Sequence, residues 1–253
     1  MPFLSIITIN YNDSEGLRKT IDSVRAQKFT DYEHIIVDGG STDASVEVIK
    51  EALADAEYAK HVTWWCSEKD SGIYNAMNKG IRHAGGKYIA TLNSGDFYLP
   101  NALEGIKESA QKNEGAVLYG AISTFLDGNF CGTVCTPASG LPKGMIPHPA
   151  SFVPIEVYKK YGLYDESFRS SGDWELFLRF YKSGISFEYI NKIITNFNLC
   201  GISSMQCELV AAENKRLLMR HGFYKVTYKQ RVVRLIKTLL HVIMKVYSGI
   251  RIL

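Results

Sequence analysis

The chain has 253 residues, 46% of them hydrophobic and 22% charged, and a net charge of +3. This length allows one large domain with a substantial core, and the composition argues against disordered, collagen-like or disulfide-stapled proteins. No apolar run approaches 18 residues and the N-terminus lacks a basic region and a cleavage site, so we expect neither a membrane span nor a signal peptide.

The charge is unevenly distributed along the chain. After Glu213 there are ten Lys and Arg residues and no acidic residue, which leaves 19 basic against 26 acidic residues, a net −7, before it. This split predicts a polyanionic partner for the tail, either an anionic membrane surface or nucleic acid. The five cysteines are scattered and complete no zinc site, so we expect reduced, mostly buried thiols in a cytosolic protein.

The first 115 residues alternate between strand and helix patterns. Apolar runs predict strands at 3–9, 32–37, 62–66 and 87–92. Helical spacing predicts a helix that Ser14 can cap, and further helices at 44–53, at 73–81 and at about 100–112. This alternation is typical of βαβ units and a parallel sheet. Because neither G-x-G-x-x-G nor G-x-x-x-x-G-K-[ST] occurs, the sequence argues against a dinucleotide dehydrogenase and a P-loop enzyme.

The strand at 87–92 ends in the small polar turn Asn93-Ser94-Gly95-Asp96. Ligands of open α/β sheets bind outside the carboxyl ends of parallel strands, so this turn and those after Ile9 and Val37 are expected to face one site. A carboxylate there can bind a hard cation such as Mg²⁺ or Mn²⁺ together with substrate phosphates. The alternative, for Asp96 and for Asp38 alike, is an Asx-type turn or a helix cap.

Past Ala116 the pattern changes. Short strands at 117–125 and 129–135 around Asp127-Gly128-Asn129 predict a hairpin, and the Gly- and Pro-rich residues 136–147 predict a loop that leads to His148. A helix is expected at 155–161, a second from Ser170 to about Tyr181, and strands at 187–190 and 193–199. Asp173 lies in the first turn of the second helix, where the helix dipole favours a carboxylate.

Six segments, taken in order, resemble the motifs of the family-2 inverting glycosyltransferases with the GT-A fold: 5–12, 37–43, 70–81, 92–96, 148–152 and 172–175. The resemblance covers roughly residues 3–200. It implies an α/β fold on a mixed central sheet, with a Rossmann-like nucleotide-sugar-binding half (1–115), an acceptor-binding half (116–213) and a tail (214–253). It also implies sugar transfer from a nucleotide-diphosphate sugar, with a UDP-sugar favoured by its frequency in the family.

The resemblance further implies roles for individual residues. Asp173 would be the general base, and Asp96 would bind Mn²⁺ or Mg²⁺ at the diphosphate, with His148 facing the same metal or diphosphate. The nucleotide-sugar contacts would come from Thr8, Tyr11, Asp38, Asp70, Asn78 and Ser94. The sequence departs from the family pattern at Gly39, where a second aspartate is common, at Asn93 and Gly95 in the Asp-x-Asp element, and at Gly172, where a glutamate precedes the base.

These roles agree with the chemistry of sugar transfer. A divalent ion neutralises the charge on a leaving diphosphate, and a carboxylate takes the proton of the attacking hydroxyl. One base without an enzyme nucleophile implies a single displacement with inversion. The alternative is a sugar-nucleotide-binding protein or regulator without turnover. His148 could instead be a loop or core histidine, and Tyr74 and Trp174 either belong to the core or stack on a ligand.

The tail carries apolar residues on one helical face over 232–246, with basic residues interspersed. Such a helix is typical of an interfacial segment on anionic lipid, which predicts a peripheral enzyme at the inner face of the cytoplasmic membrane acting on a lipid-linked acceptor in surface polysaccharide synthesis. The alternative is a helix that covers the domain's own core or a dimer partner. Nucleic acid is not expected as a partner, because no recognised binding module is present.

Overall fold

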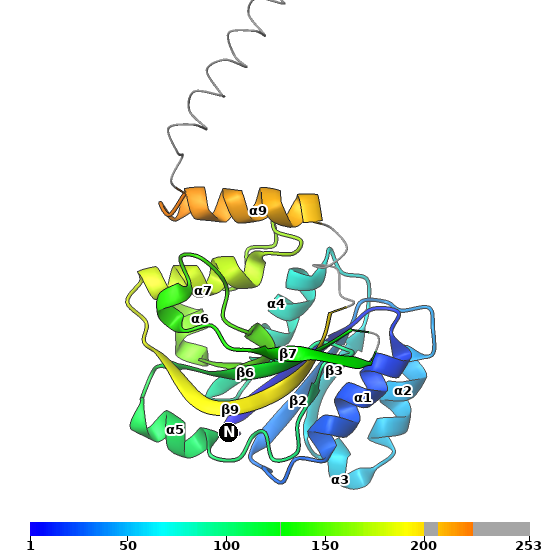
Figure 1. Cartoon of the computed structure of the whole chain (residues 1–253). Helices are drawn as coiled ribbons and strands as arrows, with labels where there is room; N and C mark the ends of the chain where they lie inside the picture. The colour runs from blue at the N-terminus through cyan, green and yellow to red at the C-terminus, as the bar shows by residue number, and fades with distance from the viewer. Residues whose placement is uncertain (127, 200–206, 225–253) are drawn as a thin grey trace, which may run out of the picture. The chain divides into compact units, whose positions relative to one another are not determined.

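The computed structural model describes residues 1–126, 128–199 and 207–224. The chain divides into two compact units, Met1–Asn214 and Lys215–Leu253. The strands, shown in Figure 1, are β1 (Leu4–Asn10), β2 (Tyr32–Asp38), β3 (Val62–Ser67), β4 (Tyr88–Thr91), β5 (Phe97–Tyr98), β6 (Val117–Leu126), β7 (Asn129–Val134), β8 (Ser151–Pro154) and β9 (Phe187–Asn198). The helices are α1 (Ser14–Arg25), α2 (Ser45–Leu53), α3 (Ala56–Ala59), α4 (Ile73–His83), α5 (Ile106–Lys112), α6 (Ile155–Tyr161), α7 (Gly172–Lys182) and α9 (Cys207–Arg220), with short 3-10 turns at Ala138–Gly140 and His148–Ala150.

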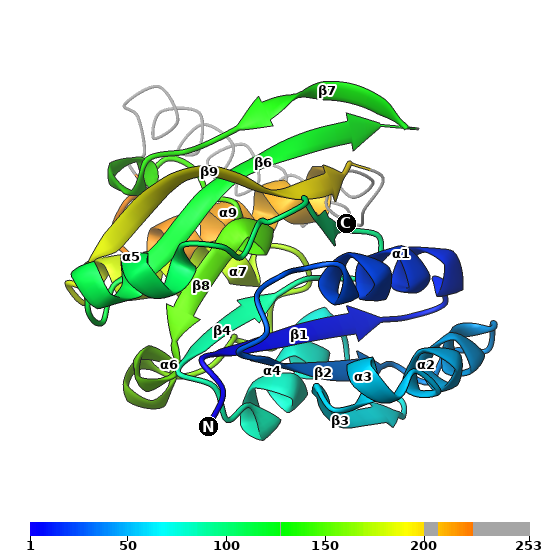
Figure 2. The ribbon, with the colours of Figure 1, turned by 90° about the horizontal axis from the view of Figure 1, so that it is seen from below.

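The strands form one mixed sheet in the order β3-β2-β1-β4-β8-β6-β9-β5, with β7 paired to β6. β1 pairs in parallel with both β2 and β4, and β2 pairs in parallel with β3. β8 then joins this parallel half to β6 through two antiparallel ladders. Figure 2 shows β1 to β4 side by side, with β6, β9 and β7 forming the second part of the sheet. The predicted parallel half on a mixed sheet is confirmed.

Helices cover both faces of the parallel half. On one face α1, α2 and α3 share an apolar cluster with Ile36 of β2. Ile36 is the register partner of Thr8, so the neighbouring Ile7 points to the opposite face. There α4 packs so closely that a Cβ added at Gly80 would lie 2.4 Å from Cγ2 of Ile7. Cover on both faces explains why every residue of β1 and β2 is buried.

Several local predictions need correction. Asp13, and not Ser14, caps α1, because its side chain accepts the Gly16 N–H. The strands expected at 187–190 and 193–199 form the single strand β9, whose register shifts against β6. The helix expected at about 100–112 is confined to α5, and β5, β8 and α3 were not predicted. Cys131 and Cys135 are exposed free thiols and Cys66 is half-buried, so the expectation of mostly buried thiols is wrong for these residues.

Within the described residues, no helix is long and apolar enough to cross a membrane. The amphipathic helix predicted at 232–246 lies outside the described residues.

Candidate active site

The polar turns of the parallel half meet at one edge of the sheet. Asn10 at the end of β1 pairs with Asp38 at the end of β2, and Asp38 pairs with Ser67 at the end of β3. On the other side of β1, the Ser94 N–H donates to the Ile9 carbonyl over 3.0 Å. The half-buried Ser94 therefore lies at the same edge as the turns after β1 and β2, which agrees with the predicted common site.

The exposed Tyr11, the half-buried Asp70 and the buried Gly39 form a cluster at this edge. A Cβ added at Gly39 would lie 2.7 Å from Oδ2 of Asp70 and 3.3 Å from Cδ2 of Tyr11, so all three groups are neighbours. The Tyr11 side chain is 66% exposed although it is aromatic. An open aromatic ring beside a carboxylate is suited to stack on a flat ring and to accept hydrogen bonds from its N–H groups.

The side chains of Thr8 and Asn78, both predicted to contact the nucleotide sugar, are buried and bound to protein groups in the structure. The Thr8 hydroxyl lies 2.9 Å from Nε2 of His34 in the core. The Asn78 amide donates to the Tyr164 carbonyl and to Glu166, and accepts the Tyr164 N–H. These residues therefore hold the fold around the site, Thr8 inside the sheet and Asn78 between α4 and the segment before α7.

The carboxylate of Asp38 is also engaged by the protein, and its side chain is fully buried. It accepts hydrogen bonds from the side chains of Asn10 and Ser67 and from both the N–H and the hydroxyl of Ser41. These donors hold its pKa below the usual range, although burial opposes them. Asp38 thus ties together the ends of β1, β2 and β3, and its predicted contact to the base stays a prediction.

Asp96 has the opposite environment. It is 5% exposed, and its described hydrogen-bond donor is the N–H of Asn198 in β9, 3.2 Å from Oδ1. Burial raises the pKa of Asp96 to about 8, and the neighbouring carboxylate of Asp13 adds to this rise. A buried carboxylate with a like charge beside it and few donors is a group that a cation would stabilise.

The donor set around Asp96 fits a divalent ion that also binds its substrate. The described residues contain no group of three or more His, Cys, Asp or Glu side chains arranged to hold a metal alone. Mg²⁺, however, commonly uses one or two carboxylates and completes its shell with phosphate oxygens and water, and Mn²⁺ shares its preference for oxygen ligands. Asp96, with Asp13 beside it, meets that requirement.

Asp173 lies at the second position of α7 and is 9% exposed. Its Oδ1 accepts the Trp174 N–H at 2.9 Å and lies 3.3 Å from the hydroxyl of Tyr74 in α4. That hydroxyl itself accepts the Gly172 N–H at 2.8 Å, so its own proton is available to Asp173. Burial raises the pKa of Asp173, which brings the carboxyl closer to the strength expected of a general base.

His148 lies beside Asp173, with its Nδ1 3.5 Å from Oδ2. Burial lowers the pKa of His148, and the neighbouring Asp173 carboxylate opposes this shift. Its other nitrogen, Nε2, is buried and has no hydrogen-bond partner among the described residues. The contact that the structure gives His148 is with Asp173, and its predicted role at the metal or diphosphate stays a prediction.

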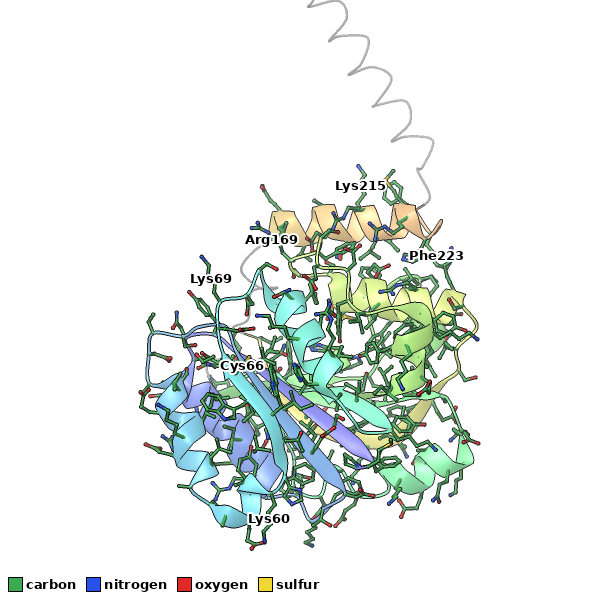
Figure 3. The ribbon with its side chains drawn as sticks, turned by 180° about the vertical axis from the view of Figure 1, so that it is seen from behind. Lys60, Cys66, Lys69, Arg169, Lys215 and Phe223 are labelled. Atoms are coloured by element: carbon green, nitrogen blue, oxygen red, sulfur yellow. The ribbon has the colours of Figure 1, made fainter. Side chains whose placement is uncertain are left out.

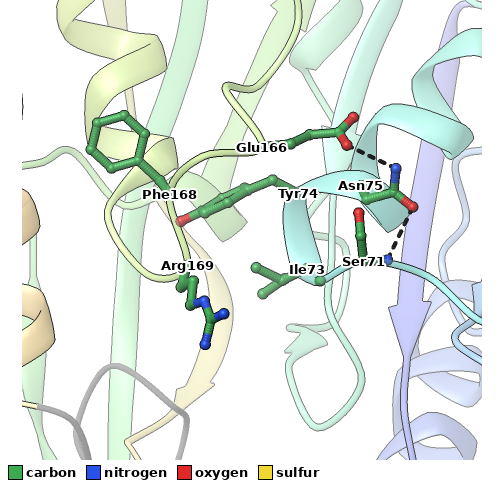
Figure 4. A pocket seen from close by; sticks show the side chains of 8 residues that line it. Ser71, Ile73, Tyr74, Asn75, Glu166, Phe168 and Arg169 are labelled. Atoms are coloured by element: carbon green, nitrogen blue, oxygen red, sulfur yellow. Dashed lines mark hydrogen bonds between the residues drawn. The ribbon is translucent and has the colours of Figure 1, made fainter.

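A cavity of about 360 Å³ lies next to Asp173. Tyr74 connects the two, because its side chain lines the cavity and its hydroxyl lies 3.3 Å from Oδ1 of Asp173. Figure 4 shows its walls, which come from the start of α4 and from the segment before α7: Ser71, Gly72, Ile73, Tyr74, Asn75, Glu166, Phe168 and Arg169. Arg169 is exposed on the outside of the molecule, as is Lys69 in the loop after β3 (Figure 3). The cavity combines aromatic and apolar walls with one acidic and one basic side chain, Glu166 and Arg169, a mixture typical of small-molecule sites.

Sequence reasoning left the role of Tyr74 open and did not single out Glu166. Tyr74 lies within one of the six segments that resemble the family motifs, and Glu166 lies shortly before another. Their importance comes from contacts between distant parts of the sequence, Tyr74 with Asp173 and Glu166 with Asn75 and Asn78. Trp174 proves to be a packing residue, because its ring N–H donates to the Leu141 carbonyl and anchors the loop before His148.

The sequence is similar to known glycosyltransferases. The model of the family described as glycosyl transferase family 2 matches residues 5–149. The chain is 35% identical over 185 residues to an uncharacterized glycosyltransferase of Mycobacterium tuberculosis, in an alignment covering 70% of this chain and 68% of that protein. It is 28% identical over 207 residues to the chondroitin synthase of Escherichia coli, covering 79% of this chain but only 29% of that protein.

Solved structures show the same fold. Staphylococcus aureus TarS 1–349 in complex with UDP-GlcNAc has a TM-score of 0.69 at 14% identity, covering 87% of this chain and 66% of that one. The mannosyltransferase PcManGT from Pyrobaculum calidifontis, in complex with GDP-Man and Mn²⁺, has a TM-score of 0.66 at 14% identity, covering 89% and 65%. This likeness confirms the predicted GT-A fold.

Proposed function

The chain belongs to glycosyltransferase family 2, and from this premise we propose that it transfers a sugar from a UDP-sugar to an acceptor hydroxyl with inversion at the anomeric carbon. The observation that carries the proposal is the buried Asp173 carboxylate beside the 360 Å³ cavity. A nucleotide-sugar donor is supported by the solved neighbours that bind UDP-GlcNAc or GDP-Man.

In this mechanism the acceptor lies in the cavity and Asp173 takes the proton of its attacking hydroxyl. Tyr74 and the Trp174 N–H hold Oδ1, which leaves Oδ2, the oxygen beside His148, as the atom that receives the proton. Tyr11 and Asp70 provide the surface for the donor's base. A bound divalent ion would supply positive charge to the leaving diphosphate, and Asp96 with Asp13 would hold it.

The acceptor and the location of the enzyme are further parts of the proposal. We infer a glycan on a lipid carrier at the inner membrane face as the acceptor, on the basis of the basic tail after Glu213. The tail itself lies outside the described residues apart from its first part, so the proposal depends on its composition.

The test is release of nucleoside diphosphate from a panel of nucleotide sugars, with Mn²⁺, with Mg²⁺ and with a chelator, for the wild type and Asp173→Asn. We expect metal-dependent release from one donor, lowered at least about 100-fold in the variant, because a general base typically contributes that much. Binding of the nucleoside diphosphate should be unchanged. Equal release by both proteins would contradict the role of Asp173.

The same experiment separates the second candidate function, a sugar-nucleotide-binding protein without turnover. Such a protein would bind one diphosphate tightly in calorimetry and release none from the panel. Absence of binding to every nucleoside diphosphate in the presence of metal would contradict both functions.

A further inference from the structure

Six consecutive backbone N–H groups, those of residues 169–174, point to side chains at the start of α7. The first N–H groups of a helix have no partner within it, and Ser171, the N-cap residue, makes no side-chain cap bond. Tyr74 accepts from residues 172 and 173, and Asp173 accepts from Trp174. The other three N–H groups are bound by a residue that lies 40 or more positions further along the chain.

That residue is Glu213 of α9. Its Oε1 accepts the Arg169 N–H at 2.8 Å, and its Oε2 accepts the Ser170 and Ser171 N–H groups at 2.9 Å each. The side chain is 6% exposed, and burial of a carboxylate is costly unless donors of this kind compensate it. The next residue, Asn214, accepts the Ser171 hydroxyl at 2.7 Å and strengthens the same contact.

The segment held by Glu213, residues 169–171, adjoins both Asp173 and the cavity. Asp173 follows Ser171 by two residues, and Arg169 forms a wall of the cavity. We propose that Glu213 is a positioning residue of the transfer reaction: its carboxylate orders residues 169–171 and thereby sets the orientation of Asp173 and of the Arg169 wall. This inference rests on the proposed function.

Replacement of Glu213 by Gln tests the carboxylate without leaving a cavity. The amide has almost the same shape but only one acceptor oxygen, so it cannot serve all three N–H groups. Its NH₂ group would face at least one N–H donor, which places two donors against each other. Glu208 is exposed on the same helix, so Glu208→Gln is the matched control with the same change of charge.

The activity arm measures kcat, donor KM and nucleoside diphosphate binding for the wild type and both variants, with the donor that the panel identifies. In Glu213→Gln we expect kcat to fall about tenfold or more, because misplacement of a catalytic group by about 1 Å is costly. Binding of the diphosphate should stay within about twofold, since the β1–β4 edge is untouched. Glu208→Gln should match the wild type, and a wild-type kcat in Glu213→Gln would overturn the proposal.

The second arm measures amide hydrogen exchange and does not depend on turnover. In Glu213→Gln the amides of residues 169–171 should exchange about tenfold faster, while those of β1 and β2 stay protected. Unchanged exchange at 169–171 would overturn the proposal even if kcat fell. If Glu213→Gln fails to fold, Glu213→Asp, which keeps the charge on a shorter side chain, takes its place with the same expectations. A wild type without turnover on any donor would contradict the proposed function, and the exchange arm would still decide whether Glu213 orders the segment.

Discussion

Three buried aspartates at or near the site show how the number of hydrogen-bond donors affects the pKa of a carboxyl group. Burial acts to raise the pKa of Asp38, Asp96 and Asp173 alike. Asp38 accepts four hydrogen bonds and its pKa is lowered, whereas one described donor at Asp96 leaves its pKa raised to about 8. The same residue type therefore serves as a structural anion at Asp38 and as a group suited to a cation at Asp96.

The raised pKa of Asp96 predicts a pH-dependent stability. Because its folded value of about 8 lies above the ordinary 3.8, the folded chain binds this proton more tightly than the unfolded chain. The resulting stability is complete below pH 3.8 and is lost as the pH rises toward 8. Asp96→Asn avoids this loss, so without divalent ions it should exceed the wild type in stability by about 1–3 kcal/mol at pH 8, and by less at pH 5.

Thermal unfolding at pH 5 and pH 8 in the presence of a chelator checks this expectation. Glu108→Gln, a change at an exposed position, serves as the control and should match the wild type in stability at both pH values. An Asp96→Asn protein less stable than the wild type at pH 8 would contradict the environment described for Asp96.

The hydroxyl of Tyr74 predicts a second effect at the residue scale. Tyr74→Phe keeps the ring stacked on Tyr164 but removes the group between Gly172 and Asp173. We expect kcat to fall about three- to tenfold, the equivalent of one hydrogen bond, with donor KM unchanged. Steady-state kinetics beside Tyr181→Phe, a tyrosine that packs on Phe187, measures this. A lower affinity for donor with normal kcat would argue against the contact to Asp173.

At the scale of elements, α4 connects the two halves of the site. Its Gly80 packs on β1. Two other residues of α4 contact the second half of the sequence, Tyr74 through Asp173 and Asn78 through Tyr164 and Glu166. A shift of α4 away from β1 would therefore move Tyr74 as well. Gly80 can therefore affect the position of Tyr74 although it does not contact Asp173 itself.

Gly80→Ala tests the packing of α4. The new methyl group would lie 2.4 Å from Ile7, a contact that forces the helix or the strand to move. We expect a loss of about 1–3 kcal/mol in the free energy of unfolding, the usual cost of overpacking. Urea unfolding measures it, with Gly144→Ala as the control, since a Cβ at Gly144 meets nothing within 4 Å. Equal stability of the two variants would show that α4 and β1 are less tightly packed than described.

At the scale of the whole molecule, the ten basic residues after Glu213 predict binding to anionic membranes. The full chain should sediment with vesicles that contain phosphatidylglycerol and not with pure phosphatidylcholine. Raising the salt to about 0.5 M should release it, because screening shortens the range of the attraction. Equal binding to both vesicle types, or none to either, would contradict the proposed membrane partner.

Periodicity alone predicted much of this architecture. The apolar runs identified β1 to β4, helical spacing identified α1, α2, α4 and α7, and the helix at 155–161 coincides with α6. The turns after β1, β2 and β4 were expected at one edge, and they meet there. These features depend on short-range patterns of burial, which a sequence displays directly.

Only the tertiary structure decided which polar side chains are free to act. It engages Thr8, Asp38 and Asn78 with protein groups and leaves Asp96 with one described donor. It also joins Tyr74 to Asp173 across 99 positions, and Glu213 to the segment before α7. The physical reason is that hydrogen bonding and desolvation of a side chain depend on neighbours distant in the sequence, whereas strand and helix patterns depend on residues a few positions apart.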